Sequence, residues 1–298
     1  MRSETHLKSI SFCAAIVFLC SAYAMAGTWA TFDYPSASWT QPSAISGNRI
    51  AGSYYESGIQ HGFVYDGSNW TVLDMPGAQS TWIQDIFGNS AIGYYNTSYN
   101  NFLYDGSNWT TLSCPGVTSL VASGIYGNNI VGTYFDSLGK THGFIYDGAT
   151  WTTIDKTGAT NTTLNGISGN NIVGEYADSF YVYHAFIYNK GKWTYLPNPD
   201  SPWAPCPHIV DISGSYVIGT YGGFNDGGYG LVYDGTSWTK LQMPGAMATD
   251  VGGIDGDKIV GSYMLSDHTI HGFIYTIPEP CTLIFLGLGA AIVRKRRR

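Results

Sequence analysis

The 298-residue sequence predicts an all-β protein, a six-bladed β-propeller made of four-stranded repeats of about 42 residues. Three observations lead to this expectation. One sequence unit recurs six times, each copy has the composition of short strands joined by tight turns, and the chain begins and ends at different points of the unit. Only 12% of the residues are charged and 15% are aromatic, which excludes a disordered chain and a long coiled coil.

The repeat is most easily seen in its Gly-x-Tyr triplets. They begin at Gly52, Gly93, Gly132, Gly174, Gly219 and Gly261, so successive copies lie 41, 39, 42, 45 and 42 residues apart. An Ile-x-Gly turn precedes each triplet, and a His-Gly-Phe-like segment, a Tyr and a Trp-Thr pair follow most of them. Because the six units leave almost nothing between the two chain ends unassigned, one repeating fold is expected.

The third unit shows why each copy should form four strands. Residues 130–134, 142–146 and 151–154 are rich in aromatic and β-branched side chains, as strands are, and a further strand ends near Ile125. Residues 127–129 and 147–150 have the Gly, Asn and Asp of hairpin turns. The unit is therefore expected to be an antiparallel sheet.

The positions of the first and last strands predict a closed ring. The body starts on a fourth-type strand at Trp29 and finishes on a third-type strand, 271–275, so the N-terminal strand can complete the last unit. An open solenoid would gain nothing from this offset. A prism-like or open β-repeat with three strands per unit is the alternative.

The two ends of the chain have the composition of targeting segments. Residues 1–26 combine basic residues, a short apolar run and a small-x-small site, which indicates a signal peptide cleaved between Ala26 and Gly27. Residues 277–298 contain Pro278, Glu279 and Pro280, then the apolar run 281–293 and a basic tail. Thirteen helical residues span only about 20 Å, which favours a transient membrane anchor over a permanent one. The repeat domain is accordingly assigned to 27–276.

The C-terminal arrangement resembles the PEP-CTERM sorting signal of exopolysaccharide-producing Gram-negative bacteria, although Cys281 replaces the small residue often found after the motif. The resemblance implies that an exosortase is a processing partner and that the protein passes from a transient inner-membrane anchor to the cell surface or medium. The repeats in turn resemble the HAF-type extracellular repeats, with His184-Ala185-Phe186 as the literal motif. Neither resemblance implies an activity.

Charge and cysteine content narrow the range of partners. Residues 27–275 keep seven basic and 19 acidic residues, so a nucleic-acid partner is not expected. Cys114 and Cys206 are the only cysteines of this body, which permits one disulfide and excludes a disulfide-built scaffold.

No residue pattern predicts catalysis, a metal or a cofactor. The four repeat histidines should occupy equivalent places in separate blades, where packing or hydrogen bonding is the favoured role, and His208 is expected in a loop. The Asp-Gly turns lack the alternating Asp and Asn residues that supply the oxygen ligands of a calcium-binding loop. No nucleophile motif or phosphate loop occurs.

The sequence therefore favours an exported binding or structural module, with exopolysaccharide as the candidate ligand. The loops between second and third strands, and between units, carry aromatics that do not repeat, which is typical of a recognition face. Trp82, Tyr181, Tyr183 and Trp203, the last in the Pro-rich stretch 197–207, are the candidate ligand-face residues. The alternative is an extracellular carbohydrate-active hydrolase or lyase, which would need a pair of acids in a pocket.

Overall fold

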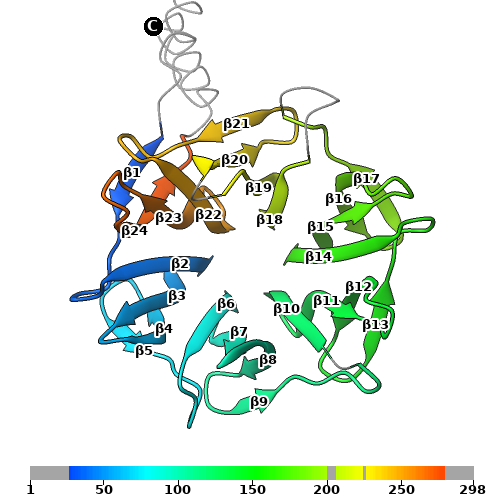
Figure 1. The fold of residues 1–298 in the computed structure, drawn as a ribbon, viewed down its shortest axis with the longest axis horizontal. Coiled ribbons are helices and arrows are strands. Elements are labelled where there is room, and N and C mark those ends of the chain that lie inside the picture. The colour runs from blue at the N-terminus through cyan, green and yellow to red at the C-terminus, as the bar shows by residue number, and fades with distance from the viewer. Residues whose placement is uncertain (1–26, 118, 200–205, 224–225, 279–298) are drawn as a thin grey trace, which may run out of the picture. The chain divides into compact units, whose positions relative to one another are not determined.

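The computed structural model describes residues 27–117, 119–199, 206–223 and 226–278. Within these ranges 24 strands form six four-stranded sheets, arranged as blades around a centre (Figure 1). The six-bladed propeller is confirmed, and the prism-like or open alternative is wrong. The described ranges contain no α-helix that could cross a membrane. The predicted apolar segment 281–293 lies outside them.

The propeller ring is the compact unit Trp29–Tyr275. Met1–Thr28 and Thr276–Arg298 make a second unit, which lies mostly outside the described residues.

Each blade contributes one strand to each of four positions, from the innermost to the outermost. The innermost strands are β2 (Trp39–Ser46), β6 (Thr81–Phe87), β10 (Ser119–Tyr126), β14 (Asn161–Ser168), β18 (His208–Ser213) and β22 (Ala248–Asp255). The second strands are β3 (Arg49–Glu56), β7 (Ser90–Tyr95), β11 (Asn129–Phe135), β15 (Asn171–Ala177), β19 (Tyr216–Tyr221) and β23 (Lys258–Met264). The third strands are β4 (Ile59–Tyr65), β8 (Thr97–Tyr104), β12 (Thr141–Tyr146), β16 (Tyr183–Asn189), β20 (Tyr229–Tyr233) and β24 (Ile270–Thr276). The outermost strands are β5 (Trp70–Val72), β9 (Trp109–Thr111), β13 (Trp151–Ile154), β17 (Lys192–Tyr195), β21 (Trp238–Leu241) and β1 (Thr28–Thr31). We number the blades 1 to 6 in the order of their innermost strands.

Blade 6 is completed by the N-terminal strand, as the sequence predicts. Its sheet has the order β1-β24-β23-β22. Just beyond β1, the backbone N–H of Phe32 donates to the carbonyl of Gly272 at 2.8 Å. The ring of Trp29 packs on those of Phe273 and Tyr275, with centroids 5.0 and 4.6 Å apart. The ring is thereby closed through strands from both ends of the domain.

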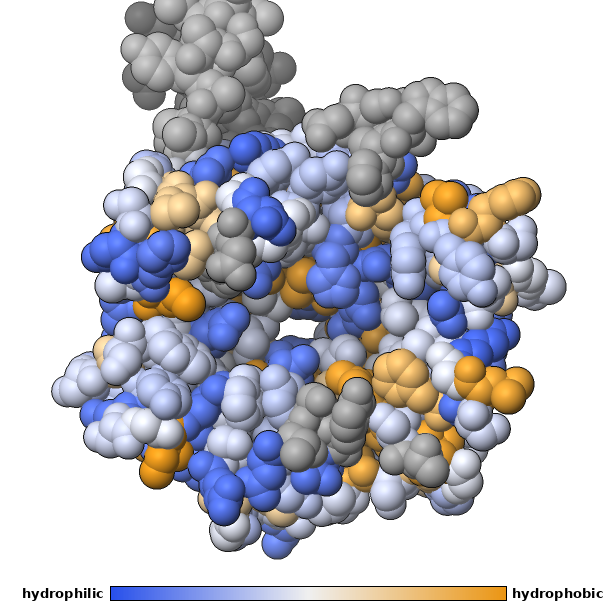
Figure 2. Space-filling view, viewed as in Figure 1, coloured by the Kyte–Doolittle hydropathy of each residue, from blue (hydrophilic) through white to orange (hydrophobic). Residues whose placement is uncertain are grey.

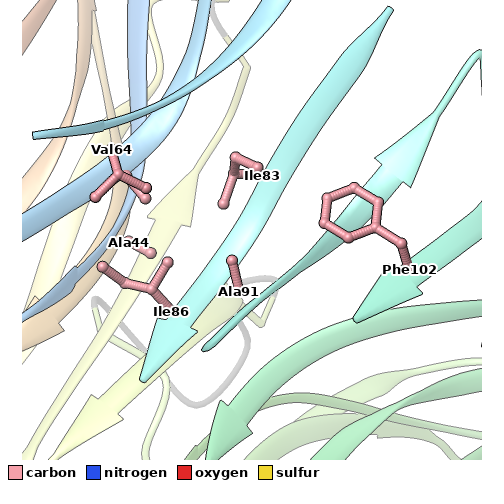
Figure 3. Packing of buried hydrophobic residues seen from close by; sticks show 7 residues of the cluster. Ala44, Val64, Ile83, Ile86, Ala91 and Phe102 are labelled. Carbon is pink, nitrogen blue, oxygen red and sulfur yellow. The ribbon is translucent and has the colours of Figure 1, made fainter. Parts of the chain in front are cut away.

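The hydrophobic core is divided among the interfaces between neighbouring blades. Between blades 1 and 2, Ala44 and Val64 face Ile83 and Phe102, and all four are buried (Figure 3). Phe102 is the aromatic of the His-Gly-Phe-like segment, and its counterparts are likewise fully buried: Phe63, Phe144, Phe186 and Phe273. The repeated apolar residues therefore form the packed interfaces between neighbouring blades.

Every innermost strand contains a β-bulge at the same place. The pairing register shifts by one residue just before the repeated Ile. The residue inserted in each strand is called here a bulge residue: Ser43, Gln84, Ser123, Asn165, Val210 and Gly252. The repeated Gly of Gly-x-Tyr packs against this strand. A Cβ on Gly132, for example, would collide with the carbonyl oxygen of Val121 and the ring of Phe144.

The antiparallel order of each blade gives the propeller two different faces. One face, called here the turn face, carries the tight turns after the first and third strands, built from residues such as Gly127 and Gly148 with positive φ. The opposite face, called here the variable face, carries the loops after the second and fourth strands. Each innermost strand begins at the variable face, so its first residues lie near that end of the centre.

Candidate functional site

Two adjoining cavities occupy the centre of the propeller, where an opening is visible in Figure 2. The main cavity has a volume of about 500 Å³ and is lined by residues from the innermost strands of all six blades. The side cavity, of about 150 Å³, lies among blades 1, 2 and 6 and shares Ser43, Gln84 and Asp250 with the main cavity. These volumes together are of the size typical of small-molecule sites.

The bulge residues all line the main cavity. A bulge redirects the side chain of the strand on which it occurs, and bulges are frequent beside functional sites. The six positions carry two serines, one glutamine, one asparagine, one valine and one glycine, although the Ile that follows two residues later is the same in every copy. The cavity is thus lined by positions at which the copies differ.

Two carboxylates in the main cavity join neighbouring blades. Asp85 accepts hydrogen bonds from the backbone N–H groups of Ile86 and, in the next blade, Ile125, both at 2.7 Å. Asp211 does the same with Ile212 at 2.7 Å and Ile254 at 3.1 Å. Burial raises the pKa of Asp211 to about 7. Burial, and then the charge of Asp211, raise the pKa of Asp85 well above its usual range.

A second polar group lies near the variable face and spans blades 4, 5 and 6. The Nδ1 of His208 lies 3.0 Å from Glu175 Oε1, which also accepts the backbone N–H of Ile209 at 2.6 Å. The hydroxyl of Thr220 donates to Asp250 at 2.6 Å. The hydrogen bond to Glu175 raises the pKa of His208, and burial raises the pKa of Asp250. The expectation that His208 lies in a loop is wrong, because it is the first residue of β18.

Trp82 is the predicted ligand-face residue that lines these cavities. It forms part of the wall of the side cavity and stacks on Tyr94, with ring centroids 5.1 Å apart and an interplanar angle of 18°. Gln41 lines the same cavity. Ser53, which is 3% exposed, also lines it, and its hydroxyl has no hydrogen-bond partner among the described residues. A flat aromatic pair beside polar groups is a suitable surface for a sugar.

The other predicted ligand-face residues are not brought to the cavities by any contact among the described residues. Tyr181 and Tyr183 lie at the β15–β16 connection of blade 4, with exposures of 71% and 47%. Trp203 lies outside the described residues. At the predicted cleavage site, Gly27 is described and Ala26 lies outside the described residues. In the sorting motif, Pro278 is described, and Glu279 and Pro280 lie outside the described residues.

The repeated histidines have partners that give them a structural role. Each stacks on the Tyr of the Gly-x-Tyr triplet: His61 on Tyr54, His142 on Tyr134, His184 on Tyr176 and His271 on Tyr263. Each also lies within hydrogen-bond distance of an aspartate, as His61 does of Asp74 at 2.7 Å. No three potential ligands converge on a metal position within the described ranges. The Asp-Gly turns are closed by aspartates such as Asp66, which accepts the N–H groups of Ser68 and Asn69.

The two cysteines of the domain are not bonded to each other. Cys114 follows β9, Cys206 precedes β18, and both are free thiols. Cys206 packs in the interface of blades 4 and 5, and burial raises the pKa of its thiol to about 12.

No protein-family model matches the chain, and no curated protein matches it in sequence. Solved structures share its fold. A mutant of the Aleuria aurantia lectin in complex with alpha-methyl-L-fucoside aligns with a TM-score of 0.52 and 16% identity, over 82% of this chain and 93% of its own. Another structure of the Aleuria aurantia lectin, described as a six-bladed β-propeller with a novel fucose recognition mode, aligns with a TM-score of 0.52 and 15% identity, over 82% of this chain and 93% of its own. A Trypanosoma rangeli sialidase aligns at 0.48 and 9%, over 91% of this chain and 60% of its own.

Proposed function

We propose that this protein is an exported carbohydrate-binding module that holds extracellular polysaccharide at the variable face. The observation that carries the proposal is the Trp82–Tyr94 stack in the wall of the side cavity, with Gln41 and Asp250 beside it. An aromatic pair supports the apolar face of a sugar ring, and amide and carboxylate groups bind its hydroxyls. The similar fold of the fucose-recognising Aleuria aurantia lectin supports a carbohydrate ligand.

The exposed tyrosines of blade 4 extend the proposed surface beyond the cavities. Tyr181 and Tyr183 belong to the same face of the propeller as the start of β6, which carries Trp82. A polymer lying across the face can contact both places, whereas a single sugar unit contacts one. Trp203, which lies outside the described residues and falls in sequence between β17 and β18, is proposed as part of the same surface.

Retention on the exopolysaccharide of the producing bacterium tests this proposal. The variants are Trp82→Ala, Tyr181→Ala, Tyr183→Ala and Trp203→Ala, and the control is Asn108→Ala in a turn on the opposite face. Loss of one stacking aromatic should weaken binding by about 1–3 kcal/mol, a range taken from aromatic and hot-spot contacts. Equal retention of all variants, with their fold intact, would contradict a binding role for this face.

Export and C-terminal processing form the second part of the proposal. The signal-peptide composition of 1–26 and the Pro-Glu-Pro motif with its apolar and basic flanks support an exosortase as partner, transient anchoring in the inner membrane, and release to the cell surface or medium.

Sugar cleavage is a second candidate function, favoured by one specific observation. Asp85, Asp211 and Asp250 line one cavity, and burial raises the pKa of each, as a general acid requires. Against this role, Asp85 and Asp211 each bind two backbone N–H groups, which is the behaviour of a structural tie. Release of reducing ends from the same exopolysaccharide, abolished by Asp211→Asn or Asp250→Asn, would establish catalysis.

A further inference from the structure

The main cavity has an excess of acidic side chains over basic ones. Asp85, Asp211 and Asp250 line it, and no Lys or Arg is among the described residues of its lining. The one basic lining residue, His208, is paired with Glu175 at 3.0 Å. Because His208 is paired with Glu175, its charge offsets that of Asp250 only in part, and among the described lining residues Asp85 and Asp211 have no cationic side chain beside them. Buried carboxylates usually have a charged partner or a shifted pKa.

The hydrogen bonds of the three aspartates leave room for such a partner. Asp85 and Asp211 are held by backbone N–H donors, and Asp250 by the Thr220 hydroxyl. An ionised carboxylate has about four acceptor positions, so each can accept further hydrogen bonds from a ligand. Burial raises the pKa of all three groups, and at Asp250 the effect of burial exceeds the opposing effect of the His208 charge.

The side cavity adds an independent sign of a ligand next to Asp250. Ser53 lines it and is 3% exposed, and within the described part of the chain its hydroxyl has no hydrogen-bond partner. A buried hydroxyl in this state costs stability, and a ligand that fills the cavity can offer it a partner. Trp82 lies in the same wall, so polar and aromatic contacts are available to one molecule.

We propose that the two cavities form one site that takes an amine-bearing sugar, with its ring against Trp82 and its ammonium group at Asp250. The inference rests on the proposed carbohydrate-binding function and specifies its ligand class. Asp250 lines both cavities, so a group bound there is within the reach of a sugar ring seated in the side cavity. An ammonium group donates three hydrogen bonds and supplies the missing positive charge. A uronic acid would place a second negative charge among the aspartates.

An organic cation fits this site better than a metal ion. In the described part of the chain, no three His, Cys, Asp or Glu side chains are close enough to serve together as ligands. The lining also contains two amides, Gln84 and Asn165, and the hydroxyls of Ser43 and Ser123, which are groups suited to sugar hydroxyls.

The test compares three oligosaccharides of equal length by titration calorimetry with the exported protein at pH 7. They are a glucosamine oligomer, its N-acetylated form and an oligo-uronate. The glucosamine oligomer should bind at least about tenfold more tightly than the N-acetylated one, because its charge is paired out of bulk water. Asp250→Asn should abolish this difference, and Trp82→Ala should weaken both neutral and amine ligands. Asp257→Asn, in the exposed β22–β23 turn, is the matched control for net charge.

A second variant keeps the inference testable if Asp250→Asn does not fold. Gln84→Lys introduces an ammonium group into both cavities and should compete with the amine ligand, lowering its affinity about tenfold. Equal affinity of wild type for the amine and N-acetylated oligomers overturns the inference and leaves carbohydrate binding intact. A preference for the amine that persists in both variants also overturns it, because the selectivity then lies elsewhere. Failure to bind any oligomer or the native exopolysaccharide overturns both proposals.

Discussion

The imidazole Nδ1 of His271 lies 2.9 Å from a carboxylate oxygen of Asp33, a residue 238 positions earlier in the chain. The other oxygen of Asp33 accepts the backbone N–H of Gly272 at 3.0 Å. His61 and Asp74 form the same pair inside blade 1, only 13 positions apart. A bond that is local in one blade therefore connects the two ends of the domain in blade 6.

Removing residues 27–38 should destabilise the whole domain. This deletion takes away β1, Phe32 and Asp33 and leaves β2 complete. The edge of β24 would be exposed. From the loss of Phe32 alone we expect the melting temperature to fall by about 3–12 °C, since one buried aromatic contributes about 1.5–3 kcal/mol and 1 kcal/mol corresponds to about 2–4 °C. Calorimetry measures the change.

A permuted chain provides the matched control for this deletion. Residues 27–38 are moved behind Thr276 through a short Asp-Gly turn, which recreates the hairpin present in the other five blades. The permuted domain should recover the original melting temperature. An unchanged melting temperature after the deletion would show that β1 does not hold the ring closed.

Replacing Gly132 with Ala should destabilise the protein by about 1–3 kcal/mol, the usual range for an overpacked core. The new Cβ would collide with the Val121 carbonyl and the Phe144 ring, neither of which can withdraw from its blade. Gly223→Ala is the control, because among the described residues a Cβ there comes within 4 Å only of Asp226, at 3.9 Å. Urea unfolding measures both variants, and equal stabilities would mean that the inner strands can move apart.

The stability of the protein should fall as the pH rises from 5 to 8. Burial raises the pKa of Asp211 from 3.8 to about 7 in the folded protein, so the folded state binds more protons than the unfolded state in this window. The stabilising contribution is complete below about pH 4 and is lost as the pH passes the native pKa. The raised pKa values of Asp85, Asp250 and His208 act in the same direction.

Asp211→Asn should have a shallower dependence of unfolding free energy on pH between 5 and 8. It should also be less stable at pH 5 by about 1 kcal/mol, because its amide cannot accept from both Ile212 and Ile254. Guanidinium titrations at several pH values measure this, with Asp257→Asn as the control. If Asp211→Asn retains the full slope, another group is responsible for it.

The exported protein should begin near Gly27 and end near Pro280. Both flanking segments have the composition of targeting segments rather than of a hydrophobic core, and they lie outside the propeller ring, which spans Trp29–Tyr275. Intact-mass measurement of the secreted form tests the two cleavages. Replacing Glu279 with Ala should prevent the second cleavage and leave the first unchanged. Detection of Arg298 in the secreted wild-type protein would contradict C-terminal processing.

Most of the fold could be predicted from the sequence, and most of the central site could not. Phe102 and Gly132 recur at fixed spacing because every blade must solve the same packing problem, so the repeat reveals them. Asp211 recurs only as Asp85 of blade 2, and Asp250 has no acidic counterpart in the other blades. Their role depends on which side chains are close together in the central cavity. A sequence pattern shared by all copies does not predict those contacts.

The sequence by itself determined the number of blades, their four-stranded composition and the completion of blade 6 by the N-terminal strand, because each follows from local strand and turn preferences repeated six times. The tertiary structure alone decided that the bulge residues face a common cavity and that Asp85 and Asp211 tie neighbouring blades. Closing the ring brings six strands from distant parts of the chain to one centre. Contacts made there depend on that closure and on no local preference of the chain.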